Sequence, residues 1–388
     1  MTRLLVASTV PSFVEAFLLP YARHFRARGW RVDAMANGIG SNEECAAAFD
    51  RVWDIKWSRN PLNPANLWHA PAHVQDIIEA GNYDIVHVHT PVAGLVCRYS
   101  LRNRIAPVRI YTAHGFHFHE NGSVPKNLMF LGFEKLAARW TDYLVVINRS
   151  DEAAARRQRF VAPGRLVYMP GIGLDTRHKY SPDSVSQDEI TLARRALQLT
   201  PEDPVLLMLA EFIPRKRHAD ALRAFARLDR PRAQLLLAGA GPTMPAMKKL
   251  AHSLGIAPRV HFLGIRRDVP VLIRAACAVL LCSQQEGLPR SVMEALALGT
   301  PVIGSDIRGT RELLEHGAGY LYKLGSVEAL CRAAERVLDH PVEAAASARL
   351  GRERIAAYDL QRILAMHEDL YAHALEHRLA RPFAAVGP

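Results

Sequence analysis

Short apolar runs alternate along the whole chain with longer polar or amphipathic stretches, and they form two series. We expect buried strands in the first half at Arg3–Ala7, Arg31–Ala36, Ile85–His89, Arg109–Thr112 and Tyr143–Ile147. A second series begins after a polar stretch and predicts strands at Val205–Leu209, Gln234–Ala238, Val260–Phe262, Ala278–Cys282 and Pro301–Gly304. Because a helical pattern follows most of these runs, the rhythm is that of parallel sheets covered by helices.

The two series predict an α/β protein with two doubly wound, Rossmann-like domains that face each other across a cleft. A chain of 388 residues is long for one hydrophobic core and suits two. We expect an N-terminal domain over residues 1–176, a second domain over 177–358, and a terminal segment over 359–388. In such sheets ligands bind outside the carboxyl ends of the strands, so the loops that follow the strands are the first places to look for a site.

Local signals near the N-terminus indicate how the first helix is built. Ser12 and Glu15 have the spacing of a capping box, which would open that helix, and Pro20 would kink it. The apolar run at the start of the chain is too short for a signal peptide, and no apolar run approaches the ~20 residues that span a bilayer. These patterns predict a cytoplasmic protein that is soluble or peripheral on the inner face of the membrane.

The charge and cysteine content of the chain limit the classes of binding partner that are expected. The formal net charge is +11, which favours anionic partners, although an arginine-rich solvated surface explains it equally well. No nucleic-acid-binding module is present in the sequence, so nucleic acid is not an expected partner. The five cysteines are scattered and form no CxxC pair, which is typical of reduced thiols and unlike a disulfide scaffold or a zinc module.

The most informative stretch is residues 283–302, SQQEGLPRSVMEALALGTPV. A predicted strand ends just before it, Glu286 lies in the following loop, and Pro289 suits the first turn of a helix. Gly299 would end that helix, and Glu294 would lie inside it. A helix N-terminus offers unpaired N–H groups and partial positive charge to an anion, and two nearby carboxylates could bind sugar hydroxyls.

This string resembles family 4 of the retaining glycosyltransferases, which have the GT-B fold. The resemblance implies a sugar-nucleotide donor site in the second half of the chain. Glu286 would contact hydroxyls of the donor sugar as one of two catalytic residues. Glu294 would bind the ribose. The backbone of Gly287 and Leu288 would line the pocket for sugar and phosphate. The alternative is a helix with two surface glutamates.

A second stretch, LAEFIPRK over residues 209–216, resembles the loop in which that family holds the diphosphate. Lys216 falls on the expected lysine and Arg215 precedes it. Glu211 stands where the family often has an arginine, which makes the phosphate site less complete, and Arg215 or Arg217 would have to compensate. A solvated basic turn is the alternative.

Two glycine-containing turns resemble segments beside the nucleotide in the same family. One follows the predicted strand Gln234–Ala238 and has the pattern Gly-x-Gly-Pro. It lacks the third glycine and the later acid of a dinucleotide-binding fingerprint. The other follows Val260–Phe262. The nucleotide-adjacent residues implied by the two turns are Gly239, Gly241, Gly264, Ile265 and Arg266.

In the first half, TAHGFHF over residues 112–118 resembles the family's His-Gly loop, which implies that His114 faces the donor sugar as the second catalytic residue. His87, His89, His117 and His119 raise the alternative of a metal site, but we expect residues at alternating positions of strand ends not to converge. The chain also has no Asp-x-Asp motif. We therefore expect no metal and no cofactor, with the helix dipole and Lys216 stabilising the leaving diphosphate.

The wider string resembles the capsule and exopolysaccharide branch of the family, which implies retaining transfer to a lipid-linked or saccharide acceptor. A UDP-sugar, for instance a UDP-N-acetylhexosamine, is the expected donor, with GDP-mannose as the alternative. By the same resemblance the amphipathic segment Leu360–Leu379 would cross back to the N-terminal domain. Two other functions fit the sequence: a sugar-nucleotide epimerase with the GT-B fold, and a non-catalytic sugar-nucleotide-binding protein.

A basic and aromatic surface in the first half suggests contact with an anionic membrane. The segment 125–140 is apolar and basic, and an ordinary amphipathic helix packed on the sheet would give the same pattern. The residues expected on this surface are Trp68, Arg98, Arg102, Arg104, Lys126, Lys135 and Arg139.

Overall fold

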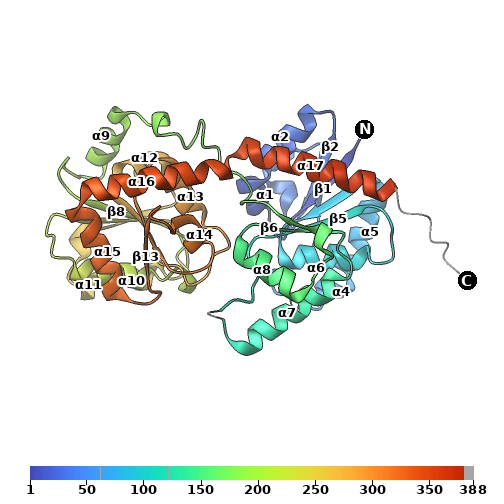
Figure 1. The fold of residues 1–388 in the computed structure, drawn as a ribbon, viewed down its shortest axis with the longest axis horizontal. Coiled ribbons are helices and arrows are strands. Elements are labelled where there is room, and N and C mark those ends of the chain that lie inside the picture. Colours follow the sequence, from blue (N-terminus) through green and yellow to red (C-terminus); the bar gives the residue numbers. More distant parts are fainter. Residues whose placement is uncertain (62, 121, 380–388) are drawn as a thin grey trace, which may run out of the picture. The chain divides into compact units, whose positions relative to one another are not determined.

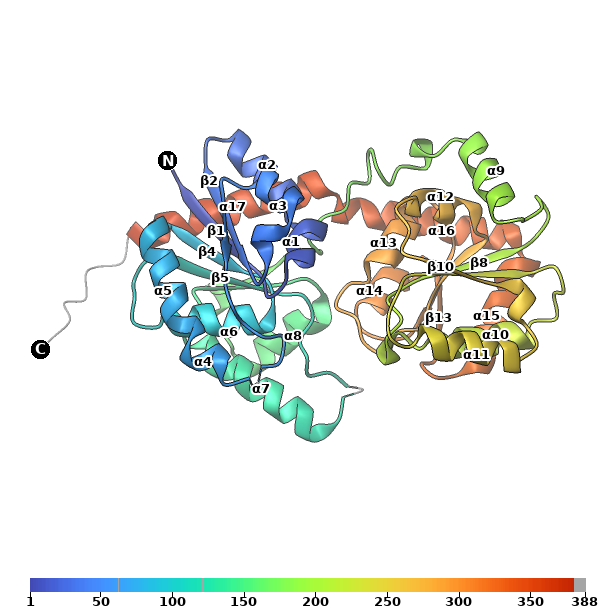
Figure 2. The same cartoon turned by 180° about the vertical axis from the view of Figure 1, so that it is seen from behind.

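The computed structural model describes residues 1–61, 63–120 and 122–379 (Figures 1 and 2). The chain divides into two compact units. Unit 1 comprises residues 1–172 together with 362–388, and unit 2 comprises residues 173–361. The sequence analysis placed these boundaries at 176 and 358.

Unit 1 is built on a parallel sheet with the strand order β3-β2-β1-β4-β5-β6-β7. Its strands are β1 (Arg3–Ala7), β2 (Arg31–Ala36), β3 (Arg51–Asp54), β4 (Ile85–Val88), β5 (Val108–Ala113), β6 (Tyr143–Val146) and β7 (Leu166–Tyr168). Its helices are α1 (Pro11–Phe17), α2 (Leu19–Ala27), α3 (Glu43–Ala48), α4 (Ala65–Trp68), α5 (Ala70–Gly81), α6 (Pro91–Ser100), α7 (Val124–Ala138), α8 (Arg149–Gln158) and most of α17 (Leu360–Leu379). The five strands predicted in this half are present, and β3 and β7 lie at the two edges of the sheet.

Unit 2 repeats the architecture with the strand order β10-β9-β8-β11-β12-β13, again parallel. Its strands are β8 (Val205–Leu209), β9 (Gln234–Ala238), β10 (Val260–Gly264), β11 (Ala278–Leu281), β12 (Val302–Ser305) and β13 (Tyr320–Tyr322). Its helices are α9 (Gln187–Ala196), α10 (His218–Arg227), α11 (Met244–Ser253), α12 (Val269–Ala275), α13 (Arg290–Ala297), α14 (Thr310–Leu314), α15 (Val327–Asp339) and α16 (Pro341–Ile355). The predicted fold of two doubly wound, Rossmann-like domains is confirmed.

In both sheets, successive strands of the chain are added first on one side of a central strand and then on the other side. The point between the two sides is called the reversal point below. It lies between β1 and β4 in unit 1 and between β8 and β11 in unit 2. The loops that follow the two central strands diverge there, which leaves room for a ligand at the carboxyl edge of the sheet. Each unit therefore has one position that its topology favours for binding.

The start of the first helix differs from the prediction. α1 begins at Pro11, so its N-cap is Val10, and no side chain caps it. The capping box expected from Ser12 and Glu15 is wrong because Pro11, which fits the first helical turn, starts the helix earlier. The chain leaves α1 at Phe17 and starts α2 at Leu19, with Pro20 in its first turn, so the predicted kink is a break between two helices.

Candidate functional site

In unit 2 the two loops at the reversal point are joined by hydrogen bonds. The loop after β8 holds Arg215 and Lys216, and the loop after β11 holds Glu286. The backbone N–H of Gln284 donates to the carbonyl of Arg215 at 2.8 Å, and the Arg215 guanidinium donates to the carbonyl of Gln285 at 3.1 Å. Sequence segments that were predicted separately thus form one structure at the favoured edge of the sheet.

An ion pair lies at the centre of this structure. The ammonium nitrogen of Lys216 is 2.5 Å from a carboxylate oxygen of Glu286, and the Arg215 guanidinium is 3.6 Å from the same oxygen. The side chains of Lys216 and Glu286 are only 15% and 11% exposed, whereas that of Arg215 is 47% exposed. Lys216 and Glu286 therefore pair in a largely desolvated place, where electrostatic interactions are stronger than in water, with the more exposed Arg215 beside them. Glu211, by contrast, is exposed.

The loop then leads directly into α13. Pro289 is the N-cap of this helix rather than a residue of its first turn, because its backbone is extended with ψ of 113°. Gly287 and Leu288 precede it, so their backbone leads to the N-terminal end of the helix, where N–H groups are free of helical partners. Gly309, with a φ of +73°, packs against this loop. A Cβ atom there would lie 1.9 Å from the carbonyl oxygen of Gly287.

Glu294 lies on α13 and is 8% exposed. Its carboxylate accepts a hydrogen bond from the Arg290 side chain at 2.9 Å, and it also interacts with Tyr180. Burial raises the pKa of Tyr180 and the neighbouring Glu294 carboxylate raises it further. Burial alone would lower the pKa of Arg290, but Glu294 and Tyr180 hold it above its ordinary value. Glu294 is thus a buried acceptor that is already oriented by two neighbours.

The two turns predicted beside the nucleotide are hydrogen-bonded to one another. The N–H of Gly239 donates to the carbonyl of Gly264 at 2.8 Å. Gly239 has a φ of +144°, and a Cβ atom there would lie 2.0 Å from the carbonyl oxygen of Ala210, so this close approach to the β8 loop requires glycine. Gly241 packs in the same way against Phe212. Beyond them, Ile265 is 81% exposed and Arg266 pairs with Asp268.

In unit 1, His114 belongs to a buried group of histidines. Its Nε2 is 3.2 Å from Nδ1 of His89, and the two rings are stacked. His87 lies behind them and bonds the hydroxyls of Thr112 at 2.7 Å and Tyr371 at 2.6 Å. His367, on α17, completes the group. The expectation that the histidines would not converge is wrong for His87, His89 and His114. Residues two apart on a strand point to the same face, and the strand before His114 lies beside the one before His89. His117 instead packs on Phe130.

The buried histidines are uncharged at neutral pH. Burial, helped by His367, lowers the pKa of His114 to about 3. Burial also lowers the pKa of His367 to about 4 and those of His87 and His89 well below their usual value. In the described residues no group of three or more His, Cys, Asp or Glu side chains is arranged to hold a metal ion. Because its Nε2 faces His89, the His114 ring presents Nδ1 to any further partner.

Four residues of these two sites were missed by the sequence analysis. Arg290 could have been found, since it precedes Glu294 by one helical turn. Tyr180, His367 and Tyr371 come from loops or helices remote in sequence, and no local pattern marks them.

Comparison with known proteins agrees with this architecture. The family described as "Glycosyl transferase 4-like domain" matches residues 14–171, and the one described as "Glycosyl transferases group 1" matches residues 189–354. The structure of Anabaena HepE in complex with UDP and glucose has a TM-score of 0.81 at 20% identity, covering 96% of this chain and 100% of that one. The structural likeness shows the GT-B fold.

Two curated relatives add sequence evidence. The putative glycosyltransferase EpsD of Bacillus subtilis is 31% identical over 375 residues, covering 95% of this chain and 96% of its own. The Escherichia coli UDP-Gal:α-D-GlcNAc-diphosphoundecaprenol α-1,3-galactosyltransferase is 26% identical over 301 residues, or 76% of each chain. Together with the matched motifs, these likenesses place the chain in family 4 of the glycosyltransferases, within the exopolysaccharide type.

Proposed function

We propose that this glycosyltransferase moves a sugar from a UDP-sugar, with UDP-N-acetylhexosamine as the first candidate, to a lipid-linked acceptor in cell-surface polysaccharide synthesis. The transfer retains the anomeric configuration and needs no metal. The observation that carries the proposal is the cluster of Lys216, Arg215 and Glu286 before the N-terminus of α13. It offers cations and the positive end of a helix to a diphosphate, and a carboxylate to sugar hydroxyls. The HepE complex with UDP and glucose and the name of the E. coli relative support this donor class.

The chemistry assigned to the cluster is charge stabilisation. As the bond between the anomeric carbon and the diphosphate oxygen breaks, its electron pair leaves with the diphosphate, and Lys216 and Arg215 neutralise that charge. The acceptor oxygen forms the new bond on the same face, and its proton passes to the departing phosphate oxygen. Glu286 orients the sugar hydroxyls, Glu294 binds the ribose, and His114 polarises the sugar through Nδ1.

The donor class is tested by ligand-induced thermal shifts. A UDP-sugar at about a hundredfold over its dissociation constant should stabilise the native protein by about 2.7 kcal/mol, whereas GDP- and ADP-sugars should not. Glu294→Ala should lose most of this shift, measured against its own unliganded Tm, because the ribose loses its acceptor. Glu353→Ala, which removes an exposed glutamate of α16, is the matched control. The assignment fails if no UDP-sugar shifts the native Tm, or if Glu294→Ala responds like the control.

Membrane contact is a second part of the proposal, and its basis is α7. Val124 and Leu128 are 69% and 63% exposed, and Lys126, Lys135 and Arg139 are exposed on the same helix. Trp68, at the end of α4, is 79% exposed. Exposed apolar groups beside cations suit the surface of an anionic bilayer on the cytoplasmic side. No helix among the described residues has the length and apolarity needed to cross a membrane.

The structure corrects the residues of this surface. Arg98 is 3% exposed and is bound inside unit 1 to Gly94, Thr141 and Glu134, so it cannot face lipid. Arg104 pairs with Glu79. Exposed Arg102 remains a candidate beside Trp68 and the lysines of α7.

Co-sedimentation with vesicles tests the membrane contact. The native protein should pellet with vesicles that contain acidic lipid and not with neutral ones, and the bound fraction should fall as salt rises. A variant with Lys126, Lys135 and Arg139 all changed to glutamine should stay in the supernatant, while Arg195→Gln, on exposed helix α9, should behave like the native protein. Equal binding to neutral vesicles would argue against an electrostatic contact.

A further inference from the structure

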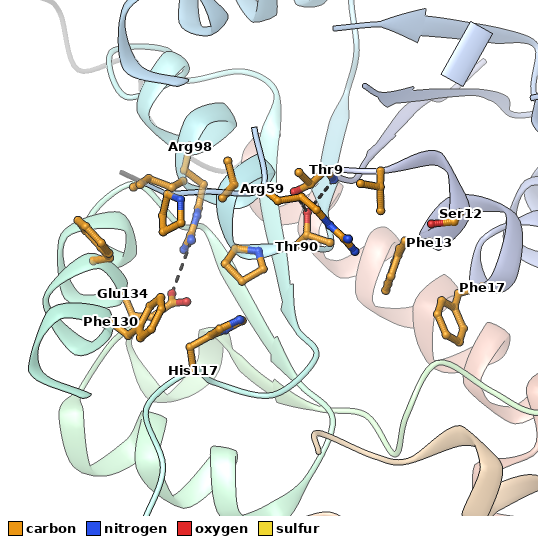
Figure 3. Close-up of a pocket in the computed structure, with 16 residues that line it drawn as sticks. Thr9, Ser12, Phe13, Phe17, Arg59, Thr90, Arg98, His117, Phe130 and Glu134 are labelled. Carbon is orange, nitrogen blue, oxygen red and sulfur yellow. Dashed lines mark hydrogen bonds and ion pairs between the residues drawn. The ribbon is translucent and has the colours of Figure 1, made fainter. Parts of the chain in front are cut away.

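Unit 1 contains a cavity of about 540 Å³ that the site described above does not use (Figure 3). It is lined by residues of the loops after β1 and β4, which include Thr9 and Thr90, and these strands flank the reversal point of the sheet. Its position is therefore the one that the topology of unit 1 favours for a ligand. Its volume is within the usual range for small-molecule sites.

The walls of the cavity are largely apolar, and four phenylalanines contribute to them. Phe13 and Phe17 come from α1, and Phe130 and Phe133 come from α7, one helical turn apart. Figure 3 shows Phe13 and Phe17 on one side of the cavity and Phe130 on the other. Phe130 and Phe133 are only half-buried although they are large and apolar, so a ligand that covered them would remove apolar surface from water.

Two charged residues, Arg98 and Glu134, form the base of the cavity, and both already have partners inside unit 1. Arg98 donates to the carbonyl of Gly94 at 2.7 Å and to Thr141 at 3.0 Å, and its guanidinium lies over the ring of Tyr111. Glu134 lies 3.6 Å from Arg98 and accepts a hydrogen bond from Tyr111. Burial raises the pKa of Glu134, and Arg98 opposes the shift. The ion pair joins α6 to α7, and the hydrogen-bonding groups of this base are largely used within the protein rather than available to a ligand.

Outside the base, the polar residues of the lining are Thr9, Ser12, Arg59, Thr90 and His117. The hydroxyls of Thr9 and Thr90 are 2.6 Å apart and bond each other. Arg59 is exposed and lines the cavity, and within the described part of the chain it has no ion pair. The ring of Phe13 is 4.9 Å from that of His114, so this side of the cavity adjoins the histidine proposed to face the donor sugar.

We infer that this cavity binds the acceptor through its lipid, with the first isoprene units of a polyprenyl diphosphate between the phenylalanines and the diphosphate at Arg59. The inference rests on the proposed function and specifies its acceptor. A saccharide would need many hydrogen-bonding partners, whereas the walls are mainly apolar, the two threonines bond each other and the base is closed. Outside the base, Ser12, His117 and Arg59 are the other polar residues of the lining. An isoprenoid needs apolar walls, and its anionic head needs one cation.

The probe is geranyl diphosphate, a short and soluble member of this class, added to the full chain in titration calorimetry. Phe130→Ala combined with Phe133→Ala should weaken its binding by about tenfold or more, because two apolar contacts are lost. Arg59→Ala should weaken the binding of geranyl diphosphate. It should leave the binding of geraniol, which lacks the anion, unchanged. Matched controls are Leu192→Ala, on exposed α9, and Arg23→Ala, on α2, which should bind like the native chain.

UDP binding, measured in the same variants, separates this inference from the proposed function. If geranyl diphosphate binds and responds to the variants while no UDP-sugar binds, the lipid site stands and the donor assignment fails. If UDP-sugar is bound and transferred to lipid-free saccharides, and the phenylalanine variants transfer at the native rate, the lipid site is wrong and the donor assignment stands. Failure of the native chain to bind geranyl diphosphate also overturns the inference.

Discussion

Replacing Lys216 with alanine should lower kcat for sugar transfer by about 10²- to 10³-fold, the loss typical of removing one group that stabilises developing negative charge. The Lys216 side chain is 15% exposed and its ammonium nitrogen lies 2.5 Å from Glu286, so it acts in a place from which most water is excluded. Its effect should fall on kcat more than on KM, because the charge on the departing diphosphate grows as the bond breaks. Initial rates over a range of donor concentrations measure both parameters.

The same substitution leaves Glu286 with only the more distant Arg215, so the variant should also lose stability. Rates are therefore compared below the Tm of each protein, and a denaturation curve accompanies them. Lys216→Arg should retain part of the activity because it keeps the charge, and Lys249→Ala, which removes an exposed lysine of α11, should retain all of it. A loss that appears only in KM would show that Lys216 binds the donor without assisting bond cleavage.

Replacing His114 with alanine should lower kcat by about 10²-fold or more and change the KM for the donor little. The imidazole is partly buried and bonded through Nε2 to His89, which leaves Nδ1 for the sugar. His89→Ala should give an intermediate loss, because the His114 ring stays but is no longer oriented. His178→Gln, at an exposed histidine outside the group, is the control.

The dependence of activity on pH tests the role of His114 separately from the substitution. Burial lowers its pKa to about 3, so the fraction of protonated imidazole stays small as the pH falls from 7.5 to 5.5. The neutral form is the reactive one in this proposal, so its activity would be lost only as the pH approaches 3. An acid limb near pH 6.5 that disappears in His114→Ala would contradict the assignment.

Prediction of the fold from sequence succeeded for the central strands and, among the edge strands, found β10 alone. β8 is a fully apolar run and β9 is apolar after Gln234; both lie in the interior of their sheet, and their predicted bounds coincide with the structure. β3, β7 and β13 were missed; each is short, lies at a sheet edge and is partly exposed. An edge strand is buried on fewer sides, so its sequence carries no continuous apolar run.

The site was predictable to the extent that its groups lie within local motifs. Lys216, Glu286 and Glu294 were named from such motifs, and the structure brings the first two together. The pairing itself could not be derived, because it depends on the order of β8 and β11 in the sheet. Tyr371 bonds His87 across 284 positions of the chain, a contact that only the folded chain shows.

Unit 1 is discontinuous, and this has a consequence for its biosynthesis. Its last helix, α17, covers Phe25 and His87 with the fully buried ring of Tyr371, but residues 362–379 leave the ribosome after the whole of unit 2. Domains generally fold in the order of synthesis, yet here the second unit is contiguous and the first lacks a segment until the second has been synthesised. During synthesis the N-terminal half therefore exposes the aromatic surface that α17 later covers. A chain truncated before residue 362 should be unable to complete the core of unit 1.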